Sequence, residues 1–290
     1  VERTIVGVNE SDLFLDSEAT SVATNTGIVE RSIVGVHDAN FVRPLGDELI
    51  TDGSFSAEGA QLITNGGFDT NSDWTLDTGW SISDGKATSL GSNFGGQLKQ
   101  TILETNKIYL LTFDIVDYTS GVLSLESTYY SETQLFSGIG SYTAYFNSSS
   151  QTELRLYSQN FTGSIDNVSV KEVGQDWTLG TDWSIGNNKA TKVSGSVNAG
   201  IEQPNIFANG KKYKLNFTVS DYVGGGLIAY IGQGNQQVAS VNSNGDKEVI
   251  FTSTVSQNKL LLYGNTTFNG SITNISVKEM LVTRESTTTN

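Results

Sequence analysis

A chain of 290 residues with a formal net charge of −14 lacks the clustered lysines and arginines of a phosphate-binding surface, so nucleic acid is not an expected partner. The absence of cysteine excludes disulfides and thiol chemistry, and no stretch approaches the ~20 apolar residues of a membrane helix, so we expect no membrane insertion. The length predicts about two domains, and 31 glycines indicate many turns.

The N-terminal region carries a short repeat, because "VERTIVGV" (Val1–Val8) returns as "VERSIVGV" (Val29–Val36). Both copies are typical of strands with a charged start, and two such strands cannot form a core alone. They pair with each other in a small intramolecular subdomain, with the sandwiches, or with another subunit through Val1, Val8, Val29 and Val36. We assign residues 1–61 to a strand-forming segment that anchors or oligomerises the chain, and we expect a homo-oligomer.

A second short repeat follows. The upstream block "ELITDGSF" (Glu48–Phe55) returns as the downstream block "QLITNGGF" (Gln61–Phe68). A much longer repeat follows this block. The stretch "WTLDTGWSISDGKAT" (Trp74–Thr88) matches "WTLGTDWSIGNNKAT" (Trp177–Thr191), and later stretches recur in the same order. A unit of about a hundred residues can enclose its own core. We therefore predict a duplicated domain at residues 62–173 and 174–282, followed by a tail at 283–290.

The hydrophobic period within the repeats is that of strands. In "KYKLNFTVSD", alternate residues from Tyr213 to Val219 are apolar, which indicates a half-buried strand. The closing block of each repeat breaks this alternation, and a bulge at Asp166–Asn167 and at Thr273–Asn274 would return its apolar residues to the core. We predict an all-β fold of two tandem antiparallel β-sandwich (jelly-roll) domains, preceded by an extended β-rich N-terminal segment.

The stretch "LITNGGFDTNSDWTLDTGWSISDGKAT" and the closing "GSIDNVSVKEV" resemble the carbohydrate-binding-module-like jelly rolls of bacteriophage virion and tail-fibre proteins. These are similar to the galactose-binding-like modules attached to many glycosidases. The resemblance covers residues 60–281 and is specific in the opening and closing blocks of the repeat. It implies a β-sandwich displayed outside the cell, on a virion surface.

Catalytic chemistry is poorly represented. The one histidine, His37, lies outside both long repeats, so neither carries the usual base of a nucleophilic triad or a histidine–cysteine metal site. A carboxylate pair for glycoside hydrolysis is not excluded by counting, but duplication favours binding, because avidity rewards two weak sites. We expect a protein that is not an enzyme and requires no cofactor.

Calcium is the metal that the resemblance implies, as a structural ion near the opening and closing strands. The matching residues of the first repeat are Asp69 and Asp166, and their hard oxygen ligands suit calcium. The alternative is that both aspartates make only local hydrogen bonds in turns. In the second repeat Thr273 replaces Asp166, so no calcium is expected there.

Aromatic rings that differ between the repeats are the candidate glycan-binding residues, because rings stack on the apolar faces of sugars. These are Tyr129 and Tyr130 of "STYYSETQ", which we predict to be a strand with one ring on each face, and Tyr230 of the second repeat. Cross-strand aromatic packing is the alternative. The four tryptophans recur in place, so we predict that they pack in the sandwich cores: Trp74, Trp80, Trp177 and Trp183.

The junction between the repeats is uneven, because the second repeat lacks its own copy of "LITNGGF". We expect an incomplete edge on the second sandwich, filled by the N-terminal segment or by a neighbouring chain.

The expected function is a non-catalytic tail-fibre or receptor-binding component, with other virion subunits and cell-surface glycans as partners. One alternative is a capsid decoration protein, head fibre or extracellular fibre in which the modules are spacers. A weaker one is the accessory region of a glycan-degrading enzyme.

Overall fold

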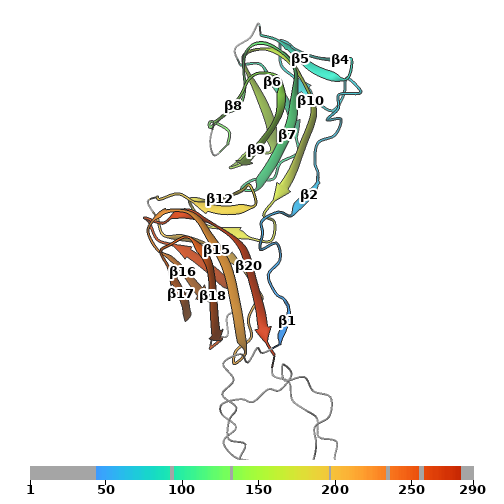
Figure 1. Ribbon diagram of the computed structural model, residues 1–290. Coiled ribbons are helices and arrows are strands. Elements are labelled where there is room, and N and C mark those ends of the chain that lie inside the picture. The colour runs from blue at the N-terminus through green and yellow to red at the C-terminus, as the bar shows by residue number, and fades with distance from the viewer. Residues whose placement is uncertain are drawn as a thin grey trace, which may run out of the picture.

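The computed structural model describes residues 44–281, except 92–94, 131–132, 196, 233–235 and 255–257. All regular elements in this part of the chain are β-strands in antiparallel pairs, and no helix there could cross a membrane. The strands form two sandwiches stacked end to end (Figure 1). The predicted all-β fold with two tandem sandwiches is therefore confirmed. The residues proposed for assembly lie outside the described residues, and their role stays a prediction: Val1, Val8, Val29 and Val36.

The first sandwich is organised by two long strands that run through both of its layers, β7 (Ile108–Leu125) and β10 (Glu153–Val173). The first half of β7 and the second half of β10 form one layer with β2, β4, β5 and β9. Their other halves form the opposite layer with β3, β6 and β8. The remaining strands are β2 (Glu58–Gln61), β3 (Thr75–Leu76), β4 (Trp80–Ser83), β5 (Lys86–Leu90), β6 (Gln97–Thr101), β8 (Gln134–Phe136) and β9 (Gly140–Asn147).

The second sandwich has the same plan, but each long strand is divided in two. One sheet has the order β12-β13-β20-β15-β18 with β1 beside β20, and the other has the order β11-β14-β19-β16-β17. Its strands are β1 (Leu45–Glu48), β11 (Thr178–Leu179), β12 (Trp183–Gly186), β13 (Lys189–Lys192), β14 (Ala199–Gln203), β15 (Lys212–Gly224), β16 (Leu227–Ile231), β17 (Gln236–Val241), β18 (Gly245–Thr252), β19 (Leu260–Gly264) and β20 (Asn269–Met280).

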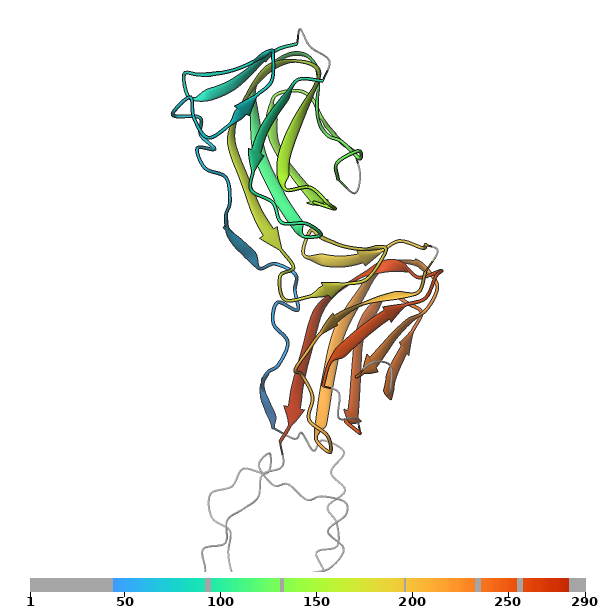
Figure 2. The ribbon, with the colours of Figure 1, turned by 180° about the vertical axis from the view of Figure 1, so that it is seen from behind.

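The chain visits the second sandwich twice. Strand β1 pairs with β20, and Ile50 and Phe55 of the upstream block are buried in the second core. The chain then enters the first sandwich at β2 and returns at Gly174, so the first sandwich is an insertion within the second. Figure 2 shows the N-terminal strand segment running along one side of both sandwiches. The predicted filling of the uneven edge by the chain's own N-terminal segment is confirmed. The predicted boundary at residue 61 differs, because residues 45–55 pack with the second sandwich.

The two blocks occupy equivalent places because their central glycines make the same close approach. Gly53 accepts a hydrogen bond from the Ile275 amide, and Gly66 accepts one from the Val168 amide, both at 2.9 Å. A Cβ atom at Gly53 would lie 1.9 Å from the Ile275 carbonyl oxygen, and one at Gly66 would lie 2.1 Å from that of Val168. Only glycine fits at these positions.

Two glutamines hold the blocks in place by the same set of hydrogen bonds. The side-chain amide of Gln203 accepts from the Thr51 amide at 2.9 Å and donates to its carbonyl at 2.9 Å. The amide of Gln100 bonds Thr64 in the same way, at 2.9 and 3.0 Å. Both glutamines are buried, so these bonds satisfy groups that would otherwise be costly to remove from water.

The tryptophans anchor each core, as predicted. The ring of Phe55 lies 5.2 Å from that of Trp177, and the ring of Phe68 lies 5.3 Å from that of Trp74. All four indoles are buried, which confirms their packing role: Trp74, Trp80, Trp177 and Trp183.

The predicted bulges are confirmed. The pairing register shifts between Asp166 and Ser169, and the matching shift in β20 skips Asn274. Asn167 and Asn274 adopt φ values of 55° and 53°, the left-handed region that asparagine tolerates best after glycine. The extra residue returns the apolar side chains on both sides of each bulge to the core: Ile165, Val168, Val170, Ile272, Ile275 and Val277.

The joint between the sandwiches is packed. Ile108, Leu110 and Val173 of the first sandwich belong to the same hydrophobic cluster as the core of the second. Strand β12 contacts β7 and β9, where the Tyr145 ring lies against Gly186. A shared cluster and two chain crossings fix how the sandwiches sit relative to each other.

Candidate ligand-binding faces and interdomain cleft

Tyr130 does not present its ring to solvent. It lies in a turn after β7, is 3% exposed, and packs edge-on against Phe146 with centroids 4.9 Å apart. Its hydroxyl donates to the Glu153 carbonyl at 3.0 Å and accepts from the Arg155 amide at 2.6 Å. Burial raises the pKa of this hydroxyl. A glycan-stacking role does not fit this burial, and the expectation that "STYYSETQ" is a strand is wrong because Glu126–Tyr130 is a hydrogen-bonded turn.

Tyr129 is half-buried, and one face of its ring is covered. The Arg155 guanidinium lies 4.6 Å from the ring centroid, a cation–π contact. The ring is also packed against the first core. A sugar could therefore contact only the part of the Tyr129 ring that the Arg155 guanidinium does not cover.

Tyr230 lies on the outer face of the sheet that contains β14, β19, β16 and β17. Leu227, Ala229 and Ile231 of the same strand point into the core, so Tyr230 points outward. Its ring meets that of Tyr263 edge-on, with centroids 6.0 Å apart.

Two more apolar side chains adjoin these rings. Ile228 lies opposite Tyr263, and Leu261 lies opposite Tyr230. All four are half-buried, and together they form what we call the apolar patch: Ile228, Tyr230, Leu261 and Tyr263. Sequence reasoning missed Leu261 and Tyr263, although alternation in "LLLYG" places both on the face opposite Leu260 and Leu262.

The matching face of the first sandwich is charged and hydrogen-bonded. By register, Ser124, Arg155 and Tyr157 stand where the second sandwich has Ile228, Leu261 and Tyr263. Glu126 corresponds to Tyr230 because each lies two residues after the first member of its set. Glu126 accepts from Ser124 at 2.5 Å and from Gln159 at 2.6 Å. Arg155 Nη1 donates to Gln97 at 3.2 Å, and Nη2 pairs with Glu153 at 2.5 Å. The polar groups of this face are thus largely bonded to one another.

The residues predicted for calcium lie on the first sandwich, at a loop and at a bulge. Asp69 is exposed, and Asp166 accepts a hydrogen bond from the Asn167 amide at 2.6 Å. The nearest carboxylate by register is Asp114, directly across the ladder from Asp166, which sequence reasoning missed. Hydrogen bonds from Ser141 and Asn167 lower the pKa of Asp114. Among the described residues no three acidic, histidine or cysteine side chains converge, and calcium at Asp69 and Asp166 stays a prediction.

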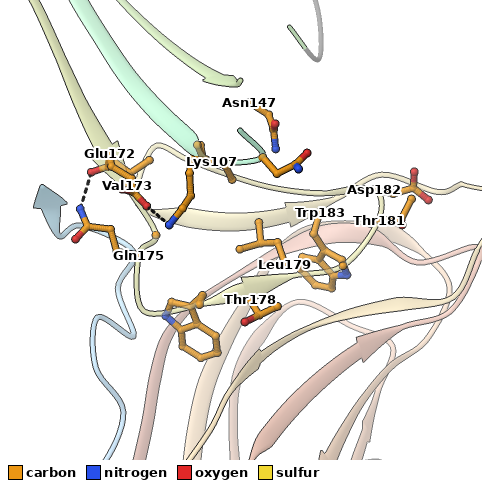
Figure 3. A pocket seen from close by; sticks show the side chains of 15 residues that line it. Lys107, Asn147, Glu172, Val173, Gln175, Thr178, Leu179, Thr181, Asp182 and Trp183 are labelled. Carbon is orange, nitrogen blue, oxygen red and sulfur yellow. Dashed lines mark hydrogen bonds and ion pairs between the residues drawn. The ribbon is translucent and has the colours of Figure 1, made fainter. Parts of the chain in front are cut away.

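A cleft of about 610 Å³ lies between the two sandwiches (Figure 3). Lys107 and Asn147 line it from the first sandwich, and Thr178 and Thr181 line it from the second. Lys107 Nζ donates to Glu172 Oε1 at 2.9 Å, and this bond raises the pKa of the lysine. The cleft exists only because the sandwiches are packed against each other.

No protein-family model matches the sequence, and no curated protein matches it. Among solved structures, the chain is similar to the N-terminal CBM22-1–CBM22-2 tandem of Paenibacillus barcinonensis Xyn10C, at 11% identity and a TM-score of 0.31, over 77% of this chain and 99% of that one.

Two archaeal-virus structures are also similar. The Sulfolobus Turreted Icosahedral Virus structure matches at 9% identity and a TM-score of 0.21, over 73% of this chain and 60% of that one. A triple jelly-roll protein from the turret assembly of an archaeal virus matches at 12% identity and a TM-score of 0.22, over 72% and 59%. At these scores none of the three carries an argument about ligand or assembly.

Proposed function

We propose that this protein is a non-catalytic virion structural or adhesion component, a tail-fibre or receptor-binding subunit that displays two glycan-binding-like modules at the particle surface. The apolar patch carries the proposal. It offers two tyrosine rings and two aliphatic side chains on an open sheet face, with the Glu202–Lys259 ion pair beside it. Rings with polar neighbours are the combination that binds the apolar faces and hydroxyls of sugars.

The path of the chain supports a displayed arrangement. Leu281 donates a hydrogen bond from its amide to the Pro44 carbonyl at 2.9 Å. Both ends of the described chain therefore leave the second sandwich at one place, and the first sandwich lies at the opposite end (Figure 1). A module held at one pole projects the rest of the molecule outward.

A glycan array with matched tyrosine variants tests the proposal. We expect Tyr230→Ala and Tyr263→Ala each to weaken glycan binding by about tenfold, because each removes a stacking surface. Tyr157→Ala is the control, since Tyr157 occupies the equivalent position on the polar face of the first sandwich. Absence of binding to every glycan on the array, by a protein shown to be folded, would refute adhesion.

That negative result would favour the alternative, in which the modules are spacers in a capsid decoration, head-fibre or other fibre protein and the N-terminal strands mediate assembly. Deleting residues 1–43 addresses assembly separately. We expect the homo-oligomer to be lost on this deletion, as measured by light scattering. An unchanged mass would count against strand-mediated assembly.

A further inference from the structure

We propose that the cleft between the two sandwiches binds a neutral, polyhydroxylated ligand, namely a short stretch of uncharged glycan. This inference rests on the proposed function and adds a second site to it, separate from the apolar patch.

The walls of the cleft are held in position before any ligand arrives. Gly174 lies so close to Ile185 that a Cβ atom would be 2.3 Å from Ile185 Cδ1, and the Tyr145 ring lies 3.2 Å from the Cβ position of Gly186. The chain also crosses between the sandwiches twice on one side, at residues 56–57 and at 173–174. A site with fixed walls loses little freedom on binding, which favours affinity for a small ligand.

The polar groups that line the cleft are mainly uncharged. Asn106, Asn147 and Gln175 contribute amides, and Thr178 and Thr181 contribute hydroxyls. Such groups both donate and accept hydrogen bonds, as sugar hydroxyls do. A volume near 610 Å³ is within the range of sites that hold small ligands.

The charges of the lining are already paired. Lys107 bonds Glu172 at 2.9 Å, and Asp182 lies 3.7 Å from Lys192. An anionic ligand would have to displace one of these carboxylates from its ammonium group, and the chain as a whole carries −14. The cleft therefore favours neutral glycans over sialylated or phosphorylated ones.

The two copies of the repeat place the acidic residue of this stretch at different positions. The first copy reads "TLDTG" (Thr75–Gly79), in which Asp77 pairs with Lys99 at 2.9 Å. The second copy reads "TLGTD" (Thr178–Asp182), with Gly180 at the position of Asp77. Only the second copy faces the cleft. The exchange leaves the stretch from Thr178 to Thr181 without a charged side chain and moves the acidic residue to Asp182, which lies 3.7 Å from Lys192.

Saccharide titration followed by amide NMR shifts tests the proposal, with cellobiose, maltose and lactose as neutral probes and sialyllactose as the anionic comparison. We expect shifts at residues 106–108, 147 and 172–183, and weaker binding of sialyllactose than of lactose. Thr178→Trp fills the cleft and should weaken neutral binding by about tenfold or more. Thr75→Trp is the matched control, because Thr75 is the equivalent exposed residue outside the cleft.

Asn147→Trp fills the cleft from the opposite wall and replaces Thr178→Trp if that variant does not fold. Shifts confined to the apolar patch, with binding unaffected by either tryptophan, would overturn the cleft proposal and leave the proposed function standing. Absence of shifts with all three neutral probes would also overturn it. The proposed function would be overturned only if, in addition, the protein bound none of the glycans on the array.

Discussion

The two sandwiches share their blocks, glutamine clamps and bulges, yet they differ on the corresponding outer face. In the first, Glu126 and Arg155 bond to neighbouring side chains, whereas in the second Tyr230 and Leu261 stand in their places. Duplication has preserved what closes each core and has changed what faces solvent. Positions constrained by the fold can therefore be separated, within one sequence, from positions that are open to new binding.

The largest expected effect is on the stability of the second sandwich, because its core includes residues of the upstream block. Removal of residues 1–56 takes Ile50 and Phe55 out of the second core, at ~2–5 kcal/mol for each large apolar side chain lost. That sum is comparable with the ~5–15 kcal/mol stability of a whole domain. We expect the second sandwich to unfold and the first to remain, measured by calorimetry. Removal of residues 1–43 is the control and should leave both transitions. If the unfolding transition of the second sandwich survived the longer deletion, the upstream block would not be part of that sandwich.

A smaller effect tests whether the two blocks are equivalent. Gly53→Ala and Gly66→Ala each place a Cβ within about 2 Å of a carbonyl oxygen, and each should cost roughly 2–4 kcal/mol in its own sandwich only. Gly67→Ser is the control. It introduces the residue that the upstream block has at Ser54, where only an ordinary contact is made. Denaturant melts resolve the two transitions, and a loss in the wrong sandwich would break the equivalence.

The smallest effect concerns an ion pair present in both copies. A hydrogen bond from Lys86 lowers the pKa of Asp117, and one from Lys189 lowers that of Asp221. Because the folded pKa is below the ordinary 3.8, the stabilisation is fully present above that value and is lost as pH falls through the lowered pKa. Asp117→Asn and Asp221→Asn should therefore lower the melting temperature slightly and equally at neutral pH, and not at about pH 2. An equal decrease at both pH values would show that the charge is not responsible.

Much of the fold could be predicted because the repeat provides two related sequences for each strand. The bulges followed from the parity of Ile165 and Val168, and the buried tryptophans followed from their recurrence. The insertion of the first sandwich within the second could not be derived from the sequence. The similarity of the two blocks does not show which sandwich each block joins, and the pairing of Glu48 with Lys278 depends on tertiary contacts. Tyr130 was misjudged because a turn, not a strand, sets the direction of its ring.

The candidate site was only partly accessible to sequence reasoning. Tyr230 was found because it differs between the copies, whereas Tyr263 was missed because its counterpart, Tyr157, is also a tyrosine. The cleft depends on how two folded units meet, and no local pattern encodes that.

The nested path also has a consequence for synthesis. The upstream block leaves the ribosome first, but its partner strand β20 follows more than two hundred residues later. At ~5–20 residues per second, the block waits roughly ten to fifty seconds, while the first sandwich becomes complete. During that interval the upstream block can compete with the similar downstream block for its place beside β10. Correct folding therefore requires the nascent chain to distinguish "ELITDGSF" from "QLITNGGF".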